Sequence, residues 1–160
     1  MAADFEMHLE GVDELKRALK ELPEKMRKKA IRGALKEAGK VIQSAAKLSA
    51  PVLQAPTATR KPGTVKRNIA VRASKFARQG GDEGVYIGIR PLSGSRQKKL
   101  GKASAKNPND PFYWRFVEFG TVKMAARPFM RTAASQKGAE AIQVFMKSVL
   151  PQIAKLDKKA

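Results

Sequence analysis

The pattern that most constrains the fold of this chain is a long amphipathic helix, predicted between about residues 24 and 48. Apolar residues recur at helical spacing along one face: Ile31, Ala34, Leu35, Ala38, Val41, Ile42, Ala45 and Leu48. Cations line another face: Lys28, Arg32, Lys36 and Lys40. Because the apolar face is rich in alanine, we expect the helix to lie close against a sheet or a second helix. Pro51 should end it.

Shorter patterns predict the elements around this helix. An earlier short helix is indicated by Val12, Leu15, Leu19 and Leu22, and Pro23 follows it. Alternating apolar residues predict one strand over Val65–Val71 and another over Val85–Ile89, with antiparallel pairing as the simplest connection. After Pro128, helical spacing continues to about Leu156, and Pro151 should kink or end that helix.

These elements predict an α+β fold with two N-terminal helices, a small mostly antiparallel sheet, and a C-terminal helix packed on the sheet. A length of 160 residues suits one domain, so we assign residues 1–160 to a single unit. Two stretches, near residues 49–63 and 91–111, lack periodicity and hold three prolines each. We expect both to be mobile basic loops, the second of them unusually long for a small domain.

The stretch from Tyr113 to Ala133 reads YWRFVEFGTVKMAARPFMRTA and is rich in aromatic residues. Its spacing favours a short helix that ends at Gly120, although a strand over residues 112–116 also fits. Glycine allows positive φ at that turn, Thr121 can bond back to it, and Pro128 suits the first position of a helix.

We interpret this stretch as a joint between two elements, with aromatic surface for packing or for a partner. The candidate joint or interface residues are Trp114, Phe116, Glu118, Phe119, Gly120, Thr121, Arg127, Pro128 and Phe129. Glu118 is the only acid between Asp110 and Glu140, and with Arg127 it is our candidate for the polar contacts of the joint. Ordinary core packing is the alternative explanation for the aromatic residues.

The charge of the chain is extreme. Lys and Arg number 33 against 14 Asp and Glu, for a net charge of +19, which favours a polyanion, an acidic protein or a membrane surface as partner. Candidate polyanion contacts are Arg60, Lys61, Lys66, Arg67, Arg96, Lys98, Lys99, Lys102 and Lys106. Such contacts would be salt-dependent and independent of nucleotide sequence. No helix-turn-helix, zinc-finger or RRM motif occurs, so a solvated basic surface stays open as the alternative.

The acids are concentrated near the N-terminus. Seven of the 14 lie within residues 1–24, whereas residues 38–109 hold two acids against fifteen Lys or Arg. An acidic start and a basic middle would suit head-to-tail contact between copies.

Enzymatic and metal-binding classes find no support in the residues. The chain has no cysteine and one histidine, His8, which alternates with apolar residues in a possible N-terminal strand over residues 5–9. No acidic cluster has the spacing of a metal site, and Gly80–Gly84 lacks the residues of a phosphate-binding loop. We therefore expect no catalysis and no cofactor. No signal peptide or membrane-length apolar run is present, so we expect a soluble protein made in the cytoplasm, with no membrane and no small-molecule substrate among its partners.

The order of motifs resembles a family of tailed-bacteriophage tail-completion, or head–tail joining, proteins. The most specific part is Phe-Val-Glu-Phe-Gly-Thr at residues 116–121, followed by Ala-Arg-Pro-Phe-Met at residues 126–130 and a final helix. Gly11–Leu15, Leu19–Pro23 and Gly63–Ile69 resemble weaker family segments in the same order, with Val65 and Asn68 in place of the usual Leu and Ser. The likeness extends from about Phe5 to Ala154.

This resemblance implies a non-enzymatic virion protein at the neck or upper tail. It implies rings of several copies around the channel through which DNA passes, in contact with connector, adaptor and tail proteins. The virion would then be its final location, after assembly in the cytoplasm of the bacterial host. A small basic protein that binds nucleic acid independently of sequence is the alternative.

Overall fold

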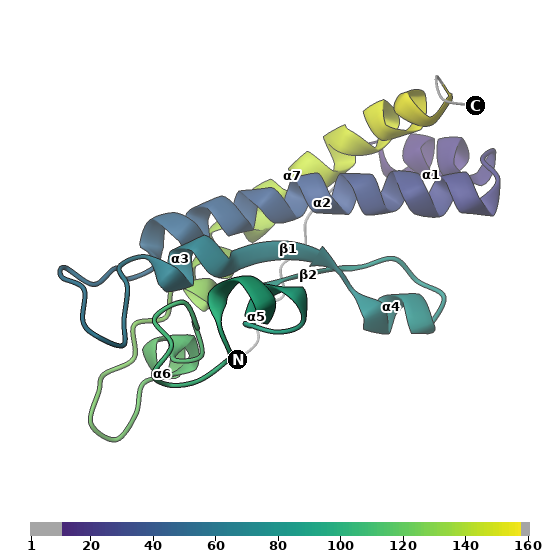
Figure 1. Ribbon diagram of the computed structural model, residues 1–160. Coiled ribbons are helices and arrows are strands. Elements are labelled where there is room, and N and C mark those ends of the chain that lie inside the picture. The colour runs from purple at the N-terminus through teal and green to yellow at the C-terminus, as the bar shows by residue number, and fades with distance from the viewer. Residues whose placement is uncertain (1–10, 158–160) are drawn as a thin grey trace.

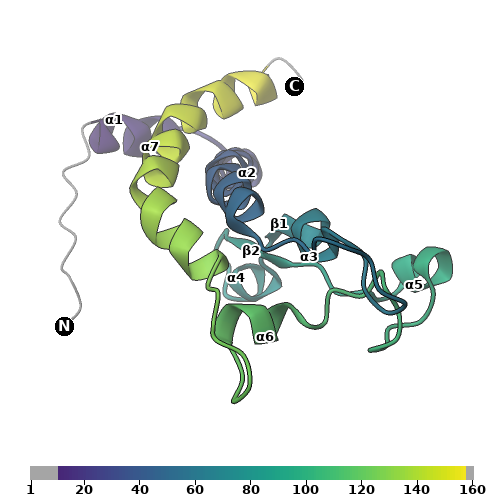
Figure 2. The same ribbon diagram turned by 90° about the vertical axis from the view of Figure 1, so that its left-hand side faces the viewer.

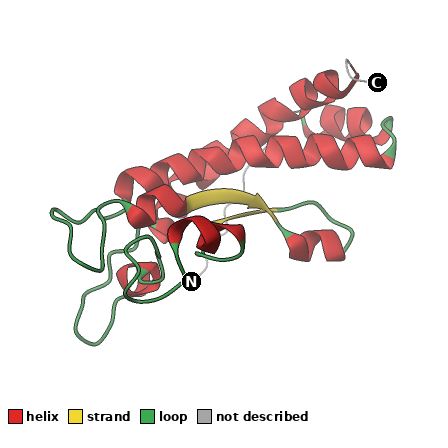
Figure 3. Ribbon diagram, in the orientation of Figure 1, coloured by secondary structure: helices red, strands yellow, loops and turns green. Residues whose placement is uncertain are grey.

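The computed structural model describes residues 11–157. Helices α1 (Val12–Lys20), α2 (Glu24–Ser49) and α7 (Met130–Asp157) form one layer, and the strands β1 (Ile69–Ala73) and β2 (Val85–Ile89) lie beneath α2 (Figures 1 and 3). The α+β prediction is confirmed, as are the two N-terminal helices. The predicted strand around His8 falls outside the described residues.

Helix α2 lies between two neighbours, and its small residues explain how. Ala30, Ala34, Ala38 and Ala46 are buried. A Cβ at Gly39 would lie 2.8 Å from Val71 Cγ1 of β1, and one at Gly33 would lie 2.5 Å from Gln152 Oε1 of α7. The alanine-rich face therefore allows close packing of α2 against the sheet and against α7, as the sequence predicted.

Helix α7 lies beside α2 (Figures 1 and 2), and among the described elements this pair makes the most extensive contact. It reaches the sheet at its start, where Phe129 and Ala133 join the core cluster. The helix continues to Asp157, so Pro151 does not end it. Most of the sheet is covered by α2, because α2 rather than α7 makes the extensive contacts with both strands.

The two strands pair antiparallel, with Ile69 opposite Ile89 and Ala73 opposite Val85. The second strand and the pairing are as predicted, but the first strand begins later. Residues Thr64–Asn68 form helix α3, which starts after Gly63 with φ 70°. Val65 and Ile69 are both buried, and their spacing of four suits a helical turn as well as an alternating strand. The alternation of apolar residues in the sequence therefore could not distinguish a helical turn from a strand at this position.

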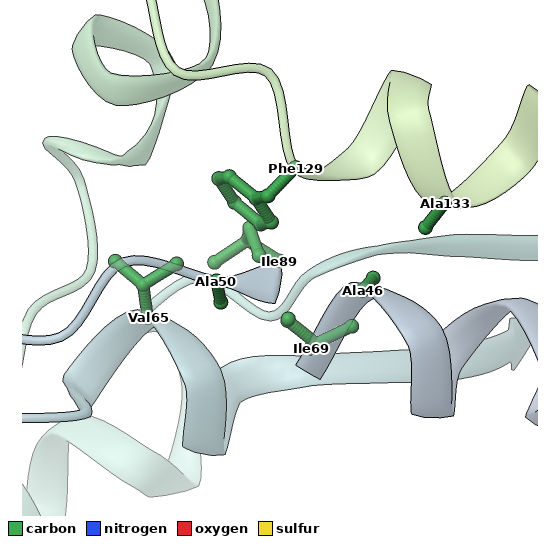
Figure 4. Close-up of a cluster of buried hydrophobic side chains, with 7 residues drawn as sticks. All are labelled: Ala46, Ala50, Val65, Ile69, Ile89, Phe129 and Ala133. Carbon is green, nitrogen blue, oxygen red and sulfur yellow. The ribbon is translucent and has the colours of Figure 1, made fainter. Parts of the chain in front are cut away.

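Figure 4 shows the core at the end of the sheet nearest α3 and α7. It is formed by Ala46, Ala50, Val65, Ile69, Ile89, Phe129 and Ala133. These residues come from α2 and its end, α3, both strands and the entry to α7. Phe129, 2% exposed, is the largest of them, so the path of the chain just before α7 depends on this packing.

Three short helices complete the fold: α4 (Lys75–Gln79), α5 (Ser95–Leu100) and α6 (Trp114–Phe119). Helix α6 confirms the predicted helix before Gly120. Helix α5 corrects the expectation of an irregular loop over residues 91–111. Its start is held by Arg96, whose guanidinium donates to the carbonyls of Arg90 and Pro91. Helical periodicity is not detectable in so short and basic a segment.

Glu83 lies between α4 and β2 and joins this loop to α2. Its carboxylate accepts from Arg32 Nε at 2.7 Å and from Arg32 Nη2 at 2.5 Å, a bidentate pair. The Arg32 side chain holds the pKa of Glu83 below its usual value by hydrogen bonding, against the opposing effect of burial. Arg32, one cation of the basic face of α2, therefore forms an ion pair with another part of the fold.

Candidate functional site

The candidate site is the joint between α6 and α7. Helix α6 ends at Gly120, the chain makes a tight turn over residues 121–124, and it returns past α6 to begin α7 at Met130. Thr121 N donates to Met124 O at 2.8 Å, and Met124 N donates to Thr121 O at 3.1 Å. We call residues 120–126 the hairpin. Figure 2 shows it projecting from the body beside α6.

Glu118 connects the two helices and is only 1% exposed. Its Oε2 accepts from the backbone N–H groups of Phe129 and Met130, each at 2.9 Å, and its Oε1 accepts from Arg131 N at 3.0 Å. These donors belong to the first turn of α7, which has no intrahelical acceptors for them. The Glu118 carboxylate of α6 therefore caps the N-terminus of α7, although it is eleven to thirteen residues away in sequence. The N-terminal end of a helix favours negative charge.

Arg131 completes the contact from the other side. Its Nε lies 3.3 Å from Glu118 Oε1, and its Nη2 donates to Glu118 O at 3.1 Å. The Arg131 side chain is 61% exposed, so it covers the carboxylate while remaining in contact with solvent. Its guanidinium also stacks on the ring of Phe119, 5.1 Å from the centroid.

Burial of Glu118 would by itself raise the pKa of its carboxyl group. The backbone hydrogen bonds from Met130, Arg131 and Phe129, with the Arg131 side chain, outweigh burial and hold this pKa below the usual 4.5. The carboxylate is therefore ionised in the folded protein at neutral pH.

This lowered pKa predicts that the stabilisation from Glu118 is lost in acid. The folded protein binds the Glu118 proton more weakly than the unfolded chain, so the benefit is complete above the unfolded pKa. It declines as pH falls through the lower folded pKa. We expect the difference in unfolding free energy between wild type and Glu118→Gln to shrink from about pH 6 to about pH 3, measured by urea titration. A difference that stays constant over this range would contradict the assignment.

Gly120 sets the direction of the turn. Its φ is 75° and its ψ is −178°, a conformation open essentially to glycine alone. A Cβ there would lie 2.8 Å from both Ala126 N and Met124 O, which are backbone atoms of the returning chain. The turn predicted at this glycine thus requires both its positive φ and its missing side chain.

Gly120→Ala should lower the free energy of unfolding by about 1–3 kcal/mol through backbone strain, with the steric overlap adding to it. Gly138→Ala is a matched control, because Gly138 lies within α7 and a Cβ there meets nothing within 4 Å. That control should stabilise the protein by roughly 0.5–1 kcal/mol. Urea denaturation of both variants provides the test, and equal effects would rule out the special role of Gly120.

The hairpin exposes apolar side chains. Val122 at its tip is fully exposed, Met124 is 41% exposed, and Phe116 and Phe119 of α6 are 49% and 60% exposed. At the base of the hairpin lies a groove of about 250 Å³, lined mainly by Val52, Leu53, Tyr113, Val117 and Met124. The joint is therefore rigidly bonded on its inner side and apolar on its outer side.

The remaining predicted joint residues take different places. Trp114 is half-buried against the core, and Phe129 lies within it. Thr121 is exposed at the turn, and Pro128 is exposed two residues before α7, not at its first position. Arg127 contributes through its backbone, whose N–H donates to Val117 O at 2.8 Å, while its side chain lines the groove. The arginine side chain that contacts Glu118 is that of Arg131, not that of Arg127. The sequence pattern did not indicate Arg131.

The nine candidate polyanion contacts divide into two groups. Arg60, Arg67 and Arg96 bond within the protein: Arg60 to Ala105 O, Arg67 to Pro62 O, and Arg96 to Asn68 Oδ1. Arg60 also stacks against Phe112 and Tyr113, with its guanidinium 4.9 Å and 4.8 Å from their ring centroids. The lysines are exposed, and within residues 11–157 they form no ion pair: Lys61, Lys66, Lys98, Lys99, Lys102 and Lys106.

Contacts between loops explain this division. Arg60 Nη1 donates to Ala105 O at 2.8 Å, and Thr64 Oγ1 donates to Pro108 O at 3.0 Å. The basic segments near residues 60–67 and 95–106 thus meet at the same end of the molecule. Buried Asp110 and Asn68 belong to the same region, and their burial was not predicted, because isolated polar residues carry no periodic signal.

Among residues 11–157, no group of three His, Cys, Asp or Glu side chains could hold a metal ion. In the same part of the chain, no helix combines the length and apolar character that crossing a membrane requires. The buried carboxylate of the joint, that of Glu118, is occupied by helix capping.

Comparison with protein-family models matches residues 13–120 to a family described as "Bacteriophage HK97-gp10, putative tail-component". The match covers about two thirds of the chain and ends at Gly120, where the hairpin begins. Comparisons with curated proteins and with solved structures gave no significant match.

Proposed function

The chain belongs to the HK97-gp10-like family of phage tail components, and from this we propose that it is a structural protein of the head–tail junction or upper tail. In this proposal several copies form a ring around the DNA channel and contact connector, adaptor and tail proteins. The copies are made and assembled in the cytoplasm of the bacterial host and end in the virion. The protein performs no catalysis and needs no cofactor.

The observation that carries this proposal is the construction of the joint. Glu118 and Gly120 hold the hairpin in one conformation, while its outer surface exposes Val122 and Met124. A pre-organised apolar projection loses little conformational entropy when a partner binds it. An assembly protein needs such a surface for its neighbours.

The exposed lysines supply a second surface. Lys98, Lys99 and Lys102 lie on or beside α5, and Lys61 and Lys66 lie at the same end of the molecule through the Arg60–Ala105 contact. Within a ring, these lysines would face the DNA in the channel or acidic surfaces of neighbouring virion proteins. Either partner would neutralise charge that otherwise disfavours bringing many copies together.

Deletion of the gene from the phage or prophage, followed by electron microscopy of the particles, tests the proposal. We expect complete heads and tails that remain unjoined, or tails that end abnormally, with normal particles restored by the wild-type gene. Mass spectrometry should find the protein in purified virions. Normal particles without it, or its absence from virions, would overturn the proposal.

The six exposed lysines also favour the alternative of sequence-independent nucleic-acid binding. Purified protein should then bind duplex DNA of any sequence, with affinity that falls steeply with salt. Replacement of Lys98, Lys99, Lys102 and Lys106 by Gln should weaken that binding and reduce the salt dependence. Tight DNA binding together with normal joining of heads and tails in the deletion strain would favour this alternative.

A further inference from the structure

We propose that copies of this chain contact one another through the hairpin and the groove at its base, the tip of one hairpin entering the groove of a second copy. This inference rests on the proposed function, because a ring requires a contact between copies. It specifies which surface makes that contact.

The charge distribution of the chain favours contact through this surface. Each chain carries a net charge of +19, so copies repel one another wherever their basic surfaces meet. Residues 48–59, which supply Val52 and Leu53 to the groove, contain no charged side chain. Residues 116–127 hold three charges: Glu118 is buried, Lys123 is exposed beside the tip, and Arg127 lines the groove. A surface with so few charges is where two such copies approach at least electrostatic cost, whereas an acidic partner would prefer the lysines.

The shape and exposure of the hairpin tip and the groove also suit a contact between copies. Val122 is fully exposed at the tip, and Val52, Leu53 and Met124 around the groove are 48%, 41% and 41% exposed. The groove is open at the base of the hairpin while the tip projects away from it. Projection and groove are thus different surfaces of one chain, as a head-to-tail contact requires.

A competing contact would join the acidic N-terminal region of one copy to the basic middle of the next. In its described part, Asp13 pairs with Lys16 at 3.6 Å and Glu24 pairs with Lys28 at 2.6 Å. These two acids are already compensated within their own helices. Contact through opposite charges would weaken as salt rises, whereas contact through a mainly apolar surface between two cationic copies would strengthen as salt screens their repulsion.

The test uses the full chain with Val122→Asp at the tip, Leu53→Asp at the groove, and Phe76→Asp as matched control. Phe76 is 87% exposed on α4, away from the joint, and its replacement changes the net charge equally. In sedimentation equilibrium we expect at least a tenfold weaker self-association for the first two variants and wild-type behaviour for the control. Wild-type association should strengthen between about 0.05 M and 0.5 M NaCl. Unchanged circular dichroism and melting temperature would show that the variants fold.

Mixing the two interface variants sharpens the test. Each retains the surface that the other has lost, so an equimolar mixture should form pairs although neither variant associates alone. The inference is overturned if the mixture stays monomeric, if Val122→Asp associates like wild type, or if salt weakens wild-type association. Such results, with the protein present in virions and required for joining, would reject this contact and leave the proposed function intact. Absence from virions would reject the function itself.

Discussion

Replacement of Glu118 by Ala should lower the free energy of unfolding by about 3–5 kcal/mol. The carboxylate accepts the N–H groups of Phe129, Met130 and Arg131, and each buried donor left unsatisfied costs about 1–3 kcal/mol. Glu118→Gln should cost less, because the amide keeps one acceptor oxygen but points N–H donors at the other site. Urea denaturation followed by circular dichroism measures both changes.

Two controls separate helix capping from simple loss of charge. Glu140→Ala removes an exposed carboxylate that pairs with Lys137 at 2.6 Å, and should change stability by no more than about 0.5 kcal/mol. Arg131→Ala removes the salt bridge to Glu118 but keeps the backbone donor, and should cost no more than about 1 kcal/mol because that side chain is 61% exposed. If Arg131→Ala costs as much as Glu118→Ala, the ion pair rather than the cap stabilises the joint.

Phe129→Ala should lower the free energy of unfolding by about 3–5 kcal/mol, as expected when a buried aromatic ring is removed from a packed core. Phe129 is 2% exposed and contacts residues from α2, α3 and both strands, so the cavity cannot close by a local movement. Because the ring also positions the backbone that Glu118 caps, the hairpin should loosen. Thermal unfolding and hydrogen exchange of the amides of residues 129–131 measure the two effects.

Phe119→Ala is the matched control for this change. Phe119 lies in the same joint but is 60% exposed and contacts Arg131 through its ring, so its loss should cost less than about 1 kcal/mol. Equal costs for the two phenylalanines would show that Phe129 does not anchor the core. If Phe129→Ala is stable but its amides at residues 129–131 exchange rapidly, the ring serves mainly to hold the joint.

Much of the fold could be predicted because it depends on repeated local patterns. The apolar stripe of residues 31–48 predicts α2, and the alternation of residues 85–89 predicts β2 with its observed bounds. The start of β1 could not be predicted, since Val65 and Ile69 reach the core from a helical turn as readily as from a strand. Helices α4 and α5 have five and six residues, and neither repeats apolar residues at helical spacing.

The candidate site was only partly visible in the sequence. The isolated acid Glu118 and the glycine after it identify an unusual turn, but not the partners of the carboxylate. Those partners are backbone groups of Phe129, Met130 and Arg131, and every residue type except proline has such a donor. Arg127 and Arg131 are equally plausible partners by spacing, and the path of the hairpin selects Arg131.

The basic surface illustrates the same division. Net charge and composition come directly from the sequence, and they imply anionic partners. Which cations remain free is decided by tertiary contacts, because Arg60, Arg67 and Arg96 find carbonyl or amide acceptors while the six lysines stay exposed. Planar guanidinium groups can satisfy several acceptors at once, which suits them to these internal contacts.

The helical and strand segments with strong periodicity, the lack of cysteine, the excess of positive charge and the order of motifs that marks the family could all be identified from the sequence alone. These properties are carried by neighbouring residues or by composition, so no fold is needed to detect them. The capping of α7 by Glu118, the need for a glycine at position 120, and the mainly apolar groove at the base of the hairpin appear only in the folded chain. Each of these depends on segments distant in sequence meeting in space, where hydrogen-bond geometry and packing select one arrangement from many that the local patterns allow.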